Sequence, residues 1–85
     1  MNKLDKAKKE FRKVHHDYYQ YLDQFNCDEE IALTISATLH GLGLSLVEKL
    51  EAIIAIEEKA TVAGIAPSFL YAKLDEYKVK FKVSP

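Results

Sequence analysis

The side chains best suited to catalysis or metal binding in this sequence are three histidines, His15, His16 and His40, and one cysteine, Cys27. Adjacent residues of a helix lie about 100° apart, so His15 and His16 cannot both hold one ion from a regular helix. No histidine lies three or four residues from another histidine or from Cys27, which is the spacing of helical metal sites. We therefore expect no bound metal and no other cofactor.

The same residues give little sign of an enzyme. A nucleophile pair of Cys27 and His40 stays open, although free cysteine is usually a small apolar residue in a core. His15 lies beside a predicted apolar stripe, where a partly buried, hydrogen-bonded histidine is the simpler explanation. The sequence has neither a glycine-rich phosphate loop nor a nucleophile elbow. We expect no catalytic residues, no small-molecule substrate and no enzymatic activity.

Length and composition predict one small helical domain over residues 1–85. A chain of 85 residues can bury a single core with little to spare. Three Gly and two Pro supply too few turn residues for a β-sandwich. The single cysteine cannot form an internal disulfide, and the first residues lack the apolar stretch of a signal peptide, so we expect a cytoplasmic protein.

A membrane span is not expected. Charged residues make up 29% of the chain, which is typical of globular proteins. The longest uncharged run, residues 31–47, only reaches the lower limit of a spanning length. We interpret this run as a buried helix followed by a turn.

Apolar periodicity predicts four helices with short connections, over about residues 3–25, 27–40, 45–63 and 67–80. The first has apolar side chains at the a and d positions of three heptads. These positions are Leu4, Ala7, Phe11, Val14, Tyr18, Tyr21 and Phe25. Such a narrow seam must pack on another helix, either in the same bundle or in an intermolecular coiled coil.

The break between the second and third helices is predicted at Gly41-Leu42-Gly43, since glycine is the usual residue just past a helix end. Ser45 with Glu48 then forms a capping box that starts the next helix. One long bent helix through both glycines is the alternative. At the end of the chain, residues 78–83 alternate apolar and basic residues, which fits a helix end or an extended tail; we expect helix to about Lys80.

The third predicted helix is apolar around much of its circumference. A small chain has few elements with which to cover such a helix, so we expect part of it to lie against another subunit. The predicted protein-interface residues are Leu46, Leu50, Ile53 and Ile56, with Tyr19 as an aromatic at the edge.

Charge is distributed unevenly along the chain. Residues 1–13 sum to +4, residues 14–58 to −8 and residues 59–85 to +3. In an up-and-down antiparallel bundle of four helices the two basic termini share one end and form a basic pole. Lys6, Lys9 and Lys13 are the predicted anion contacts of this pole.

We therefore expect an all-α, small antiparallel helical bundle of about four helices that works by binding protein. It would associate with itself as a homodimer or dock on a partner protein, as a regulatory or accessory module. The alternative is an accessory nucleic-acid-binding protein that uses the basic pole. Only one of the twelve basic residues is Arg, so such binding would be non-specific and salt-sensitive.

Overall fold

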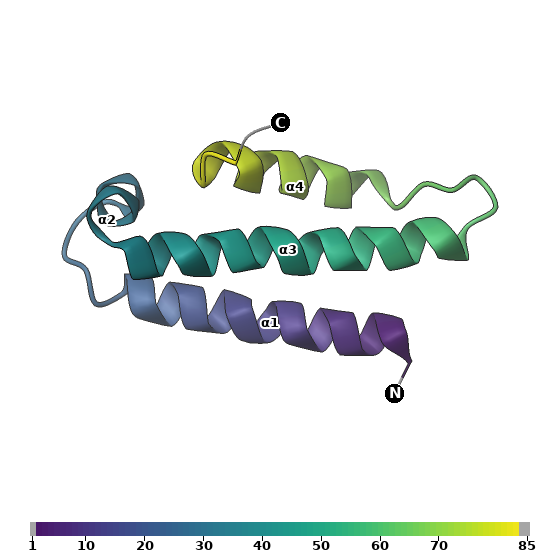
Figure 1. Ribbon diagram of the computed structural model, residues 1–85, viewed down its shortest axis with the longest axis horizontal. Helices are drawn as coiled ribbons and strands as arrows, with labels where there is room; N and C mark the ends of the chain where they lie inside the picture. Colours follow the sequence, from purple (N-terminus) through teal and green to yellow (C-terminus); the bar gives the residue numbers. More distant parts are fainter. Residues whose placement is uncertain (1, 84–85) are drawn as a thin grey trace.

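The computed structural model describes residues 2–83 and contains four helices in that range, with no strand among these residues (Figure 1). In chain order they are α1 (Lys3–Leu22), α2 (Glu29–Ile35), α3 (Ala37–Ala60) and α4 (Ser68–Lys80). The predicted all-α class, with four helices packed as a small bundle, is confirmed. α4 ends at Lys80, as expected. The open question of helix or extended tail covered residues 78–85, and residues 84 and 85 lie outside the described range.

The heptad seam of α1 packs within the chain itself. Ala7 and Tyr18 of the seam are buried, and Phe11 and Val14 pack partly buried against the same core. α1 makes its main contacts with α3, so the seam faces a helix of the same bundle. The helix ends at Leu22, earlier than the seam suggested, because the next residues turn tightly through backbone hydrogen bonds.

The predicted break at Gly41-Leu42-Gly43 is wrong, because α3 runs unbroken through both glycines. The break falls instead at Ser36, where α2 and α3 meet at a bend of 110°. The hydroxyl of Ser36 accepts a hydrogen bond from the backbone N–H of Leu39 (3.1 Å) and caps α3. Ser45 lies inside α3 and caps nothing. The ranges 27–40 and 45–63 are thereby replaced by 29–35 and 37–60.

The apolar circumference of α3 follows from its central position. Figure 1 shows α3 between α1 on one side and α4 on the other. The molecule measures 46 × 29 × 16 Å, and its shortest dimension is not much more than the ~10–12 Å diameter of one helix. The long helices thus lie nearly in one layer, and α3 is covered on two sides by its own chain.

The predicted basic pole is also wrong. With seven residues, α2 is about 10 Å long and cannot cross the bundle, so only three helices run its length. These run up, down and up, which makes α1 and α4 parallel. Phe11 lies beside Tyr77 and Tyr18 beside Phe81, in the same order along both helices. The N-terminal end of α1 and the C-terminal end of α4 therefore lie at opposite ends of the molecule (Figure 1).

Candidate protein-binding groove

Side chains from α1 and from the C-terminal end of α4 meet over α3 at one end of the bundle. Three rings form an aromatic cluster there, Tyr18 of α1, Tyr77 of α4 and Phe81, the residue that follows α4. The Phe81 ring lies 5.4 Å from the ring of Tyr18 and 5.8 Å from that of Tyr77, centroid to centroid. Tyr18 and Phe81 are among the largest fully buried side chains of the described residues. The cluster fills the space between the two helices at this end.

Polar contacts fix the aromatic cluster in place. The hydroxyl of Tyr18 donates a hydrogen bond to Glu29 Oε2 (2.5 Å), and Lys80 Nζ lies 3.4 Å from Glu29 Oε1. The His40 ring bonds through Nε2 to the backbone carbonyl of Phe81 (2.8 Å). Burial, and then the hydrogen bond to Glu29, raise the pKa of Tyr18 far above its usual range, so its hydroxyl stays protonated.

Toward the other end, side chains of α1, α3 and α4 line a groove of about 480 Å³, the α1–α4 groove. Its lining is mostly apolar and comes from all three long helices and from the residue before α4. The residues that line it are Lys8, Phe11, His15, Leu50, Ile53, Glu57, Pro67, Phe69, Leu70, Lys73 and Tyr77. The volume lies within the range of ~300–1,000 Å³ that is typical of small-molecule pockets.

Phe69 is the most conspicuous residue of the groove, because 69% of its surface is exposed. Leaving a phenylalanine side chain in water forgoes about 1.5–3 kcal/mol of burial free energy. Its position is held by the segment before α4. The Tyr71 hydroxyl donates to Glu58 Oε2 of α3 (2.6 Å) and accepts from the backbone N–H of Ala66 (2.9 Å). These bonds tie the start of α4 to the end of α3.

The charges of the groove lie near its edges. Lys8 on α1 and Lys73 on α4 are exposed, and Glu57 of α3 is half-buried. The ammonium of Lys73 lies 3.3 Å from Glu76 and 5.6 Å from the centre of the Tyr77 ring. Burial raises the pKa of Tyr77 to about 12, so this ring stays neutral at ordinary pH. The groove is therefore apolar inside, with a cationic side chain on each of its two walls.

The predicted interface residues lie in different environments. Leu46, Leu50 and Ile53 are buried within one copy of the chain, so the prediction that another subunit is needed to cover them is corrected. The reason is that α4 covers a side of α3 that we had assigned to another subunit. Leu50 and Ile53 nevertheless form part of the floor of the groove. Ile56 is half-buried, and so is Tyr19, whose ring lies 4.7 Å from the ring of His15.

The predicted anion contacts Lys6, Lys9 and Lys13 are exposed on one face of α1, around a shallow depression that Glu10 also lines. Glu10 Oε2 lies 3.5 Å from Lys49 of α3. The basic residues of the C-terminal end do not join this face, because that end of the chain is at the far side of the molecule (Figure 1). A basic strip on α1 thus replaces the expected pole.

Sequence reasoning missed the walls of the groove, above all Phe69 and Lys73. Phe69 lies off the apolar stripe of α4, which includes Leu70 and Tyr77, and such a residue would usually be counted as incidental surface. A large aromatic off the stripe, two residues after Pro67, was the one local signal available. The groove itself arises from the way α1, α3 and α4 pack together, which periodicity does not encode.

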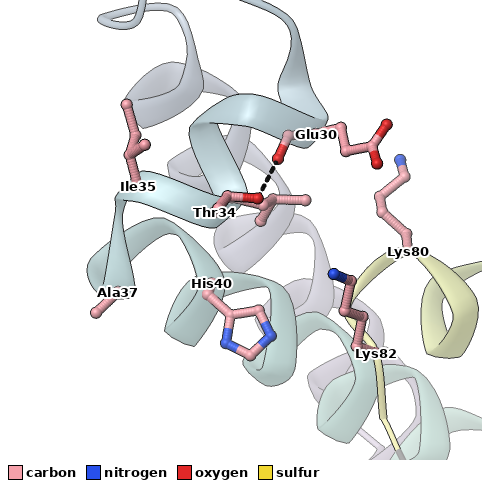
Figure 2. Close-up of a pocket in the computed structure, with 8 residues that line it drawn as sticks. Glu30, Thr34, Ile35, Ala37, His40, Lys80 and Lys82 are labelled. Atoms are coloured by element: carbon pink, nitrogen blue, oxygen red, sulfur yellow. Dashed lines mark hydrogen bonds between the residues drawn. The ribbon is translucent and has the colours of Figure 1, made fainter.

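A second cleft, of about 430 Å³, lies between α2 and the C-terminal turn. Figure 2 shows Lys80 and Lys82 reaching into it, with the carboxylate of Glu30 facing Lys80. Ile35 lies at its outer edge and points away from both lysines. Glu29 and Glu30 line the adjoining space together with these two lysines, so the acidic and basic charges balance. The ion pair between Lys80 and Glu29 holds α2 against the C-terminal turn.

Within residues 2–83, no three His, Cys, Asp or Glu side chains are grouped as a metal ion would require. Among the described helices, none by itself has the length and apolarity to cross a membrane; α2 and α3 meet those criteria only as a pair bent by 110°. Comparison with protein families, with curated proteins and with solved structures gives no match for this chain.

Proposed function

We propose that this protein is a non-enzymatic binding module whose α1–α4 groove takes the apolar face of a short helix. The observation that carries the proposal is the groove itself, an apolar trough of about 480 Å³ with Phe69 exposed at its side. Binding an amphipathic helix in an apolar groove is a recurrent mode of protein recognition. Burial of Phe69 by the bound helix would supply binding free energy that the free chain lacks.

A helix is favoured as occupant by the architecture around the groove. α1 and α4 are parallel and flank α3 in nearly one layer, so a further helix laid over α3 along the groove would pack against all three long helices as in a bundle. A small ligand that filled only the floor beside Leu50 and Ile53 would leave Phe69 in water. We therefore propose a macromolecular partner rather than a small molecule.

The charges on the walls select among helices. Lys8 and Lys73 face the groove from opposite helices, and Glu57 is the one acid among the residues that line it. A helix with acidic residues beside its apolar stripe would complement this arrangement, and a basic helix would be repelled. A cytoplasmic location is part of the proposal, supported by the lone exposed thiol of Cys27.

A library of displayed helical peptides tests the proposal. We expect selection to enrich peptides with apolar residues at i, i+3 or i+4, and i+7, flanked by acids. Their binding should be lost in Phe69→Asp and kept in Val79→Asp, a matched change of an exposed apolar residue on α4 outside the groove. Selected peptides that bind both variants equally would show that the groove is not their site.

The second candidate function is non-specific binding of nucleic acid by the basic strip of α1. It is favoured by the placement of Lys6, Lys9 and Lys13 on one exposed face. Lysines that contact phosphate release counterions, so the affinity for a DNA duplex should fall steeply with salt. Changing Lys9 and Lys13 to Glu should abolish a mobility shift that the wild-type chain produces. No shift at low salt would remove this candidate.

A further inference from the structure

α2 presents an apolar face that its own chain leaves uncovered. Ile31 and Ile35, four residues apart, are 51% and 66% exposed and lie on the same side of the helix. Asp28, the exposed residue just before α2, is three residues from Ile31 and lies toward that side as well. Glu30 does not border this face, because its carboxylate faces Lys80 while Ile35 points away from it (Figure 2). Ala32, about one quarter of a turn round the helix, is buried. α2 is thus a short helix with an outward apolar pair and one acid, Asp28, beside it.

This face offers an i, i+4 apolar pair, the first part of the pattern that the α1–α4 groove should select. The groove is apolar inside and has lysines on both walls, whereas α2 offers two isoleucines beside Asp28. Opposite charges around an apolar contact fix which surfaces meet and in which orientation. We infer that the occupant of the groove is α2 of a second copy of this chain; this inference rests on the function proposed above.

If α2 fills the groove, it must come from a second copy, because α2 and the groove are far apart within one chain. α2 lies at one end of the long axis, and Phe69 lies toward the other end, where α4 begins (Figure 1). In a molecule 46 Å long, α2 cannot reach the groove of its own chain. Two copies placed side by side in opposite directions bring α2 of each copy to the groove of the other. Used reciprocally around a two-fold axis, the contact gives a closed dimer.

The contact is small, and the affinity should be modest. Each half of the dimer buries mainly the side chains of Ile31, Ile35 and Phe69. The area that these side chains bury is far smaller than the ~800 Å² per partner of a standard interface. We expect a dimer that dissociates on dilution in the micromolar range or above, as transient interfaces of this size do. Both contacts must form together, so damage to either surface should weaken the whole dimer.

The experiment is sedimentation velocity of the full chain over a range of concentrations, with one variant of each surface. Ile35→Lys places a cation opposite the lysines of the groove, and Phe69→Asp places an acid opposite Asp28. Each should raise the dissociation constant at least about tenfold, the effect expected at a central interface residue. Ala55→Lys, on the exposed face of α3, is the control and should dimerise as the wild type does.

An equimolar mixture of the two variants provides a second and independent readout. The copy with Phe69→Asp keeps an intact α2, and the copy with Ile35→Lys keeps an intact groove, so one native contact forms between them. In the other contact, the new lysine faces the new aspartate. We expect the mixture to dimerise more tightly than either variant alone. A dimer that neither variant weakens, or a mixture no better than its parts, would overturn the inference.

Failure of this inference can be told apart from failure of the proposed function. A wild-type chain that stays monomeric at millimolar concentration, yet binds selected peptides in a manner sensitive to Phe69→Asp, would exclude the second copy and leave the groove as a site for another protein. A chain that dimerises without effect from Phe69→Asp and selects no groove-dependent peptide would overturn both.

Discussion

The ring of Phe81 lies directly on the backbone of α3 at Gly43. A Cβ atom built at Gly43 would come within 2.4 Å of two carbons of the ring, which is closer than any real contact. Phe81 is buried and held by its neighbours in the aromatic cluster, so the ring has no room to move aside. Glycine in the middle of this helix is therefore required by a residue 38 positions later in the chain.

Gly43→Ala should destabilise the protein by about 1–3 kcal/mol, the usual cost of overpacking a filled core. Gly41→Ala is a matched control two residues earlier in α3, where an added Cβ meets no atom within 4 Å. It should stabilise by about 0.5–1 kcal/mol, because alanine is the better helix former. Urea unfolding of both variants measures the difference. Equal effects would contradict the placement of Phe81.

The position of the helix break gives a second prediction. Ser36→Ala removes the side chain that caps α3 and should cost about 1 kcal/mol in the free energy of unfolding. Ser45→Ala changes a residue inside the helix and should stay within about 0.5 kcal/mol of the wild type. If the helix instead restarted after Gly43, Ser45→Ala would be the costly change. Thermal or urea unfolding distinguishes the two cases.

The helices were predictable because their signals are local. The heptad seam that begins at Leu4 and includes Phe11 and Tyr18 identified α1 and the face that it buries. The break between α2 and α3 was not predictable in the same way. In the sequence, two glycines are a stronger signal for a helix break than one serine. In the structure, Gly43 is required by its contact with Phe81, and the cap of α3 is provided by Ser36.

The arrangement of the helices was less predictable than the helices themselves. Counting four helices placed both termini at one end, but α2 is too short to act as a full member of the bundle. The same error led us to assign Leu46, Leu50 and Ile53 to another subunit, although α1 and α4 enclose them. The groove depends on how α1, α3 and α4 pack together, which is a property of the folded chain, so only its floor residues were named from sequence.

Buried tyrosines predict a loss of stability in alkali. The pKa of Tyr77 is raised to about 12 by burial, and burial and the bond to Glu29 raise that of Tyr18 further. In the unfolded chain both titrate near ~10. Below that pH both tyrosines are protonated in the folded and in the unfolded chain, and their contribution to the free energy of unfolding does not change with pH. Above it the unfolded state loses them first, so stability falls by about 1.4 kcal/mol per pH unit for each tyrosine.

Tyr18→Phe should change this behaviour in two ways. At neutral pH it should cost about 1–3 kcal/mol, because Glu29 loses a short hydrogen bond from a buried donor. Between about pH 10 and 12 the decline of stability with pH should become less steep, since Tyr18 no longer contributes a proton that the unfolded chain loses first. Urea unfolding at several pH values measures both effects. An unchanged slope would show that Tyr18 is not protected from ionisation.

The salt dependence of self-association separates the groove from the basic strip of α1. If lysines on the groove walls attract α2 of a second copy, the dimer of the wild-type chain should weaken several-fold between low and high salt.

Changing Lys8 and Lys73 to Gln should weaken the dimer at low salt and remove most of that salt dependence. Changing Lys6 and Lys9 to Gln removes the same charge from α1 outside the groove and should leave both properties unchanged. Sedimentation at two ionic strengths measures this. A dimer that strengthens with salt in all three proteins would mean that apolar contact alone joins the copies, and that Lys8 and Lys73 play no part in selecting α2.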